Sequence, residues 1–158
     1  MLRKIGLALA LVSATALAAC TQQDKTYLDL AGGGFVFNYR NAVAFVDVVL
    51  VPRKPLPENA TVEVTMVDPA GGPQIVLSER PSGGGRLEFA TEPLHGIKAA
   101  TDYPVKIRLV AADGTELQVI DKNFRSELDQ SVLPPLPLTV GPGYTPNPAL
   151  QQDAPKPL

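Results

Sequence analysis

Apolar and polar residues alternate with a period of two along much of the chain between residues 27 and 140. Such alternation predicts β-strands, because successive side chains of a strand point to opposite faces. The clearest case is Thr61–Asp68, in which apolar and polar residues alternate regularly. Val43–Val51 is almost continuously apolar, which is typical of a strand buried on both faces. Phe35–Tyr39 places three aromatic rings on one face.

Turn residues separate these predicted strands. Asp68–Gly72 and Asp113-Gly114 combine aspartate with glycine, a combination typical of tight turns. The second lies between two alternating segments and therefore predicts a hairpin from Tyr103 to Phe124. Further strands are expected at 74–79 and 86–90. No window shows the 3.6-residue apolar period of an amphipathic helix, although Arg125–Val132 allows one helical turn. The pattern predicts an all-β fold, a single Ig-like β-sandwich of seven or eight mostly antiparallel strands.

Prolines divide the chain unevenly. Eight of the 16 prolines fall between Pro134 and Leu158. That density opposes regular packing, so we expect a sandwich domain over 27–140 and a disordered proline-rich tail over 141–158. Alternation of Leu136 and its neighbours onto the sandwich would carry order to about Val140.

The first 19 residues have the pattern of an export signal. Arg3 and Lys4 form a positive start, and Ile5–Ala19 carries no charge. As a helix that run would span about 22 Å, less than the roughly 30 Å hydrocarbon core of a bilayer. We therefore expect residues 1–19 to be a cleaved signal peptide and not a transmembrane anchor.

The signal ends in Leu17-Ala18-Ala19-Cys20. This run resembles the lipobox of bacterial lipoprotein precursors. The resemblance implies that signal peptidase recognises Leu17, Ala18 and Ala19. It also implies that Cys20, the only cysteine of the chain, becomes the first mature residue and carries the acyl chains. Several acyl chains together hold a protein on a bilayer.

The anchor also predicts a location. Residues 20–26 would form a short lipidated tether, and Thr21 follows the cysteine where an inner-membrane retention signal has aspartate. The resemblance therefore implies an outer-membrane lipoprotein of the bacterial envelope at the periplasmic face, with surface exposure left open. Removing residues 1–19 takes away two cations, so the mature chain has 12 Lys+Arg against 16 Asp+Glu, a net charge of −4.

Charge and composition narrow the chemistry. The net charge of −2 for the whole chain offers no field to attract nucleic acid, so no nucleic-acid partner is expected. One cysteine and one histidine exclude an intrachain disulfide, a Cys-rich zinc site and an iron–sulfur cluster. We expect no metal and no cofactor.

The sequence contains no recognisable catalytic motif. His95 lies in a sequence typical of a loop, without a second histidine or cysteine as co-ligand. The two triple-glycine runs, 32–34 and 83–85, lack the Lys-Ser/Thr of a phosphate-binding loop and indicate turns or bulges. Asp68 and Asp113 belong to turns. Four serines occur outside any G-x-S-x-G context: Ser78, Ser82, Ser126 and Ser131. We expect that the protein is not an enzyme.

One stretch of the sequence contains a series of specific motif residues. Val48–Asp68 contains an apolar strand, Arg53, the pair Leu56-Pro57, Ala60 two residues after an acidic one, and an alternating strand ending in aspartate. It resembles the opening of the YbaY/YscW group of small lipoproteins. The likeness continues to about residue 124 through Ile75–Glu79, Tyr103–Ile107 and Asp113-Gly114.

The resemblance has functional consequences. Some members of that group are pilotins, which escort secretin subunits to the outer membrane, so it implies a pilotin-like chaperone for an outer-membrane partner. We expect a lipid-anchored binding module with an envelope protein as partner. The alternative is a structural or ligand-binding envelope lipoprotein without catalysis. Binding through an open strand edge and binding of a helix between the sheets both stay open.

Overall fold

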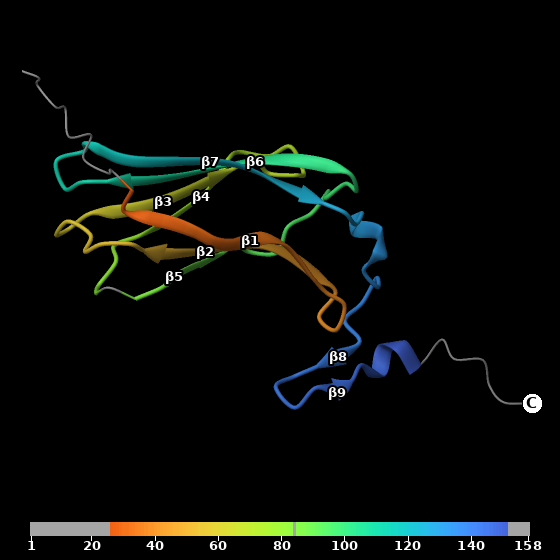
Figure 1. The fold of residues 1–158 in the computed structure, drawn as a ribbon. Helices are drawn as coiled ribbons and strands as arrows, with labels where there is room; N and C mark the ends of the chain where they lie inside the picture. The colour runs from red at the N-terminus through yellow and green to blue at the C-terminus, as the bar shows by residue number, and fades with distance from the viewer. Residues whose placement is uncertain (1–25, 84, 152–158) are drawn as a thin grey trace, which may run out of the picture.

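Residues 26–83 and 85–151 are described by the computed structural model, in which two antiparallel sheets pack face to face (Figure 1). The first sheet has the order β1-β2-β5 and consists of β1 (Leu28–Asn38), β2 (Val43–Pro52) and β5 (Leu87–Ala90). The expected signal peptide and lipobox, with Leu17, Ala18, Ala19 and Cys20, lie outside the described residues.

The second sheet has the order β4-β3-β6-β7. It consists of β3 (Thr61–Met66), β4 (Ile75–Glu79), β6 (Thr101–Val110) and β7 (Glu116–Ser126). All strand pairs in both sheets are antiparallel. The predicted all-β sandwich is confirmed, and so is its hairpin, since Tyr103 pairs with Phe124 across β6 and β7.

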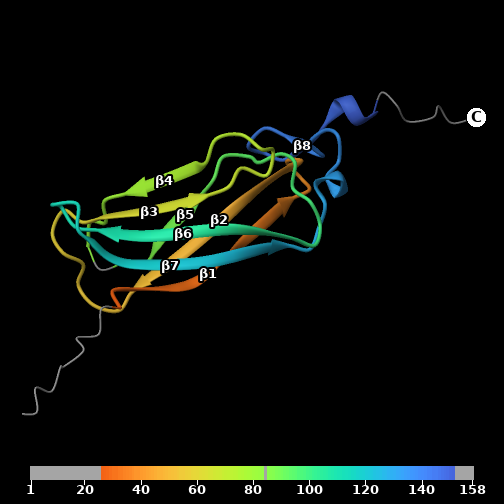
Figure 2. The same cartoon turned by 90° about the horizontal axis from the view of Figure 1, so that it is seen from above.

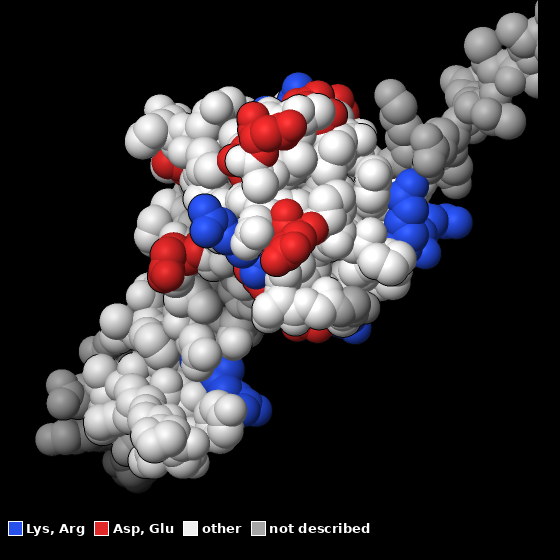
Figure 3. All heavy atoms as spheres, turned by 90° about the vertical axis from the view of Figure 1, so that its left-hand side faces the viewer, with Lys and Arg blue, Asp and Glu red and all other residues white. Residues whose placement is uncertain are grey.

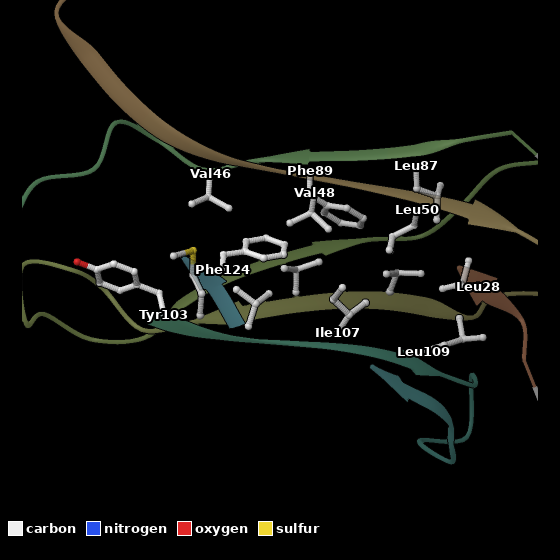
Figure 4. Packing of buried hydrophobic residues seen from close by; sticks show 14 of the residues in the cluster. Leu28, Val46, Val48, Leu50, Leu87, Phe89, Tyr103, Ile107, Leu109 and Phe124 are labelled. Carbon is white, nitrogen blue, oxygen red and sulfur yellow. The ribbon is translucent and has the colours of Figure 1, made fainter. Parts of the chain in front are cut away.

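The core lies between the two sheets and is made of their inward-facing apolar side chains (Figure 4). Val62, Val64 and Met66 of β3 are buried and alternate with half-buried residues, as the sequence pattern predicts. The core of the sandwich also takes in Leu28, Val46, Val48, Leu50, Leu87, Phe89, Ile107 and Leu109.

Strand β2 corrects one expectation. Its inner positions, from Ala44 to Leu50, are buried, but the alternate positions are only half-buried and Val51 is exposed. The strand is therefore not buried on both faces. Its outer face carries no second layer within the described residues, although that face is apolar in sequence except for Asp47.

Both expected aspartate turns form. The N–H of Gly71, with φ of 83°, donates to the carbonyl of Asp68 over 2.9 Å. The N–H of Gly114, with φ of 86°, donates to the carbonyl of Ala111 over 2.9 Å. Glycine suits both positions because a side chain disfavours positive φ. The triple-glycine run 32–34 lies in β1 beside a register shift, which is the bulge its composition indicates.

The C-terminal segment is more ordered than its prolines suggest. After the 3₁₀ helix η1 (Gln130–Val132) come a small hairpin of β8 (Thr139–Val140) and β9 (Thr145–Pro146), and the 3₁₀ helix η2 (Pro148–Gln151). Figures 1 and 2 show this hairpin at the end of the sandwich opposite the start of β1.

This segment corrects the boundary expected at Val140. Asn147 holds it, because its side-chain amide donates to the Pro137 carbonyl over 2.7 Å and its backbone N–H donates to the Leu138 carbonyl over 2.9 Å. Such non-local hydrogen bonds leave no periodic trace in a sequence. Leu136 and Leu138 are more than 40 % exposed and do not pack onto the sandwich. Residues 152–158 of the expected tail lie outside the described residues.

Candidate functional site

The sequence-derived candidate residues are scattered. His95 is exposed in the loop after β5, and Ser78 lies in β4. Ser126, at the end of β7, is buried and its hydroxyl donates to the Leu128 carbonyl over 2.7 Å. Ser82 is exposed in the β4–β5 loop, and Ser131 is part of η1. No described hydrogen bond joins any of these four serines to His95.

Two carboxylates have structural work in turns. The side chain of Asp113 accepts the N–H of Thr115 over 2.9 Å, and that bond holds the pKa of the carboxyl below its usual value. The side chain of Asp129 caps η1 by accepting the N–H of Ser131 over 3.0 Å, which lowers its pKa, and Lys98 adds a smaller effect in the same direction.

Within residues 26–83 and 85–151, no group of three or more His, Cys, Asp or Glu side chains is placed to hold a metal ion. In the same residues, no helix has the length and apolar character needed to cross a bilayer. All buried side-chain nitrogen and oxygen atoms described have hydrogen-bond partners. No unsatisfied polar group therefore points to a bound ligand there.

One side of the sandwich is closed by β1 and β7, which we call the closed side. Gln118 of β7 makes three hydrogen bonds to the start of β1. Its side-chain oxygen accepts the N–H groups of Tyr27 and Leu28 over 2.6 and 2.9 Å, and its side-chain nitrogen donates to the Leu28 carbonyl over 2.7 Å. Farther along, Gly33 of β1 lies against Phe124 of β7. The two sheets are thus joined along this side.

On the opposite side, which we call the open side, no described hydrogen bond joins the two sheet edges, and the sheets approach closely only where Gly96 lies against Pro69 and Ala70 of the β3–β4 turn. The open side is formed by β4, an edge strand of the second sheet, and by β5 with residues 91–95, the edge of the first (Figure 2). Residues 91–95 continue that edge, because the N–H of Thr91 donates to the Val46 carbonyl over 3.0 Å and the N–H of Leu94 to the Ala44 carbonyl over 2.7 Å.

A groove of about 430 Å³ lies on the open side, and we call it the β4 groove. Its lining comes from the first residues of β4, Ile75, Val76 and Leu77, and from residues 91–95. Ile75 and Leu77 also pack against the core, whereas Val76 is 59 % exposed. The groove is therefore an apolar opening beside an edge strand.

The rim of the β4 groove is acidic. Asp68 and Glu92 line it together with His95, and no lysine or arginine does. The Asp68 side chain accepts the N–H of Ala70 over 2.9 Å. Among the described residues, neither Asp68 nor Glu92 forms a salt bridge. Two carboxylates on the rim of an apolar groove favour a cationic ligand.

The end of the molecule at which β1 begins has a different character. Figure 3 shows acidic and basic side chains interspersed on this end. Arg53 forms a salt bridge with Asp29, and the ammonium of Lys54 lies 4.0 Å from the centre of the Tyr27 ring. The cations named here have local partners, which makes this end a less selective surface than the β4 groove.

A second apolar surface lies on the C-terminal segment. Residues 130–151 contain no charged side chain. Seven of the 13 exposed large apolar side chains of the described residues fall between Leu128 and Leu150. Arg40 contacts this segment, because its guanidinium lies 4.4 Å from the centre of the Tyr144 ring and its carbonyl accepts the N–H of Leu138 over 2.8 Å.

Comparison with known proteins does not identify a family for this chain. No protein-family model matches the chain, and no curated protein matches it either. The likeness to the YbaY/YscW group therefore stays a prediction from the motifs quoted above.

The β4 groove was missed by sequence reasoning. The strand expected at 74–79, observed as Ile75–Glu79, and the aspartate turn before it were predicted, but the lateral order of strands was not. One sequence signal was present, since Ile75–Leu77 is a run of three apolar residues that breaks the alternation seen in β3. Such a run indicates a strand with apolar side chains on both faces.

Proposed function

We propose that this protein is a lipid-anchored binding module of the bacterial envelope. The lipobox ending in Cys20 supports the anchor, and the open side of the sandwich supports the binding role. The single observation that carries the binding role is the β4 groove, an apolar opening beside an unpaired strand edge. A partner in the envelope is held near the membrane by this arrangement.

Binding fits the groove better than catalysis does. Its side chains are largely apolar, and one oxygen of the Asp68 carboxylate on its rim is engaged in the turn that precedes β4. General acid–base chemistry requires titratable groups held at hydrogen-bond distance from the substrate and from one another. Binding of a partner through apolar contacts and a charged rim requires only the kind of surface that the β4 groove has.

The anchor is tested by Cys20→Ser in the full chain, expressed in a Gram-negative host. We expect the variant to lose incorporation of labelled palmitate and to leave the membrane fraction. Thr21→Ser is the matched control and should stay at the membrane, because it leaves the lipobox intact. Equal membrane association of both variants would contradict the anchor.

The binding role is tested by the location of the partner. Proteins cross-linked to the wild-type chain in intact cells are identified, and their distribution between membranes is followed in the Cys20→Ser strain. A partner that shifts away from the outer membrane supports the escort role of a pilotin-like chaperone. Absence of any cross-linked envelope protein above background would contradict the binding role.

A second hollow favours the alternative of a ligand-binding lipoprotein. It measures about 750 Å³ and lies between the β2–β3 loop, residues 52–59, and the β4–β5 loop at Pro81 and Gly83. Four prolines line it and make its wall rigid, and Arg53, Lys54 and Glu58 add charged groups for a polar part of a ligand. A small molecule retained by the purified protein and released on denaturation, found by mass spectrometry, would favour this alternative.

A further inference from the structure

We propose that β4 takes up an extended segment of the partner as an additional strand, and that this segment carries a basic residue beside Asp68 and Glu92. The inference rests on the proposed binding role and names the recognition mode and the chemistry of the partner. Three independent features carry it: the free edge of β4, the apolar groove beside that edge, and the charge of the rim.

The edge of β4 is regular and unpaired. Its five residues pair with β3 without a register shift, from Met66↔Ile75 to Val62↔Glu79. Among the described residues, no hydrogen bond outside this pairing uses the backbone of Ile75–Glu79. The second edge of the strand therefore presents N–H and C=O groups to solvent, and such a row pairs readily with another extended chain.

Strand β4 has few of the features that prevent an exposed edge from pairing with another chain. Exposed edges are commonly blocked by lysine, proline, bulges or a covering segment. Residues 75–79 contain no lysine or proline, and their single charge is Glu79 at the far end. In contrast, the edge strand β1 has a register shift between Leu30 and Gly32, and Gln118 covers its start.

The groove provides the side-chain contacts. Successive residues of an added strand would point alternately toward the β4 groove and toward solvent. Those facing the groove would meet Ile75, Leu77 and Leu94, so recognition favours apolar residues at every second position. The partner segment is therefore expected to alternate apolar and polar residues.

A helix fits this site less well than a strand. Two packed sheets are about 10 Å apart, close to the diameter of a helix with its side chains. In this protein the space between the sheets is filled by the core, including Val64 and Phe89. A helix could only lie across the mouth of the groove and would leave the backbone groups of β4 unpaired.

The charge of the rim sets the polarity of the partner. Asp68 and Glu92 lie at the Ile75 end of β4, without a cation among the groove-lining residues. All strand pairs of the two sheets are antiparallel, and an antiparallel segment would bring its C-terminal end to Ile75. We therefore place the basic residue at the C-terminal end of the bound segment.

The test uses the full chain in detergent micelles and a blocked peptide, Thr-Val-Thr-Val-Thr-Val-Thr-Lys, in which the lysine lies on the same face as the valines. The same peptide ending in Glu is the matched control. We expect the lysine peptide to bind more tightly, and amide hydrogens within Ile75–Glu79 to exchange about tenfold more slowly when it is bound. Binding without slower exchange in β4 would overturn strand addition.

The charge is tested by reversal. Glu92→Lys is expected to weaken binding of the lysine peptide about two- to five-fold and to strengthen binding of the glutamate peptide, the size of an exposed ion pair. Glu127→Lys is the matched control, because Glu127 is an exposed carboxylate after β7 that lines no described groove. Equal effects of the two variants on peptide binding would overturn the proposal that the partner segment places a basic residue beside Glu92.

The outcomes separate this inference from the proposed function. If neither peptide binds, strand addition at β4 is wrong, whatever the cross-linking experiment finds. If the peptide binds as expected but Cys20→Ser leaves the envelope partner in place, the mode of recognition holds and the escort role is wrong.

Discussion

Gly33 of β1 faces the ring of Phe124 on β7 at a separation that leaves no room for a side chain. A Cβ atom at Gly33 would lie 2.5 Å from Cζ of Phe124 and 3.1 Å from the carbonyl oxygen of Asp47. Phe124 is itself buried, so its ring has little space into which to move. Close contact between the two sheets on the closed side thus depends on a glycine.

Gly33→Ala should therefore destabilise the fold. We expect the free energy of unfolding to fall by about 1–3 kcal/mol, the usual cost of overpacking a core. Urea denaturation followed by circular dichroism measures it. Gly32→Ala is the matched control, because no atom lies within 4 Å of its added Cβ and the cost should stay below that of Gly33→Ala. Equal midpoints for the two variants would contradict the contact.

Gln118→Ala should loosen the start of β1. The change removes the acceptor for the N–H groups of Tyr27 and Leu28 and the donor to the Leu28 carbonyl. Because Leu28 is buried, its unpaired backbone groups should cost about 1–3 kcal/mol in the free energy of unfolding. Thermal unfolding and exchange of the Leu28 amide hydrogen measure the loss. Gln74→Ala, at an exposed position, should leave both unchanged.

Acid should weaken the fold partly through Asp113 and Asp129. Their pKa values are lower in the folded protein, so the unfolded chain binds more protons as the pH falls through this range. Their contribution is complete above the usual pKa of aspartate, about 4, and is lost below it. Asparagine at both positions keeps the acceptor oxygen without the titration. The double variant should lose less of its melting temperature between pH 6 and 2, as a set of thermal scans can show; an unchanged loss would contradict this.

Asn147→Ala should release the C-terminal segment without unfolding the sandwich. The change removes the bond to the Pro137 carbonyl and the cap on the N–H of Ala149. We expect faster amide exchange over residues 137–151, with the melting temperature of the sandwich nearly unchanged, because the segment packs outside the core. Asn41→Ala should change neither quantity. A lower melting temperature for Asn147→Ala would show that the segment supports the sandwich.

Much of the fold could be predicted from local pattern. The alternation in Thr61–Asp68 specified β3, and Asp113-Gly114 specified the β6–β7 turn, because both signals are contained within a few neighbouring residues. The burial of the outer face of β2 was predicted wrongly. Apolar side chains indicate that a face tends to be buried, but they do not show whether another layer of the protein covers it. The role of Asn147 could not be predicted for a related reason. Its hydrogen-bond partners, Pro137 and Leu138, come close to it only in the folded chain.

The candidate site could be predicted only in part. Period-two patterns say which face of a strand is buried, and they do not say which strand lies at an edge. The β4 groove is formed between Ile75 and residues 91–95. These residues are separated in the sequence by the rest of β4, a loop and β5, and only the fold brings them together. Gln118 decides which side is closed, and one glutamine in a strand carries no sequence signal for that role.

The bonds of Gln118 also determine how the molecule bears a mechanical load. Tension from the N-terminal side reaches Tyr27 and Leu28, where three bonds to Gln118 of β7 and the pairing of β1 with β2 resist it together. The pull is thereby shared by both sheets at the first residue of the fold. A pull between the N-terminal end and a partner bound at the open side would therefore be transmitted through both sheets and would not act on β1 alone.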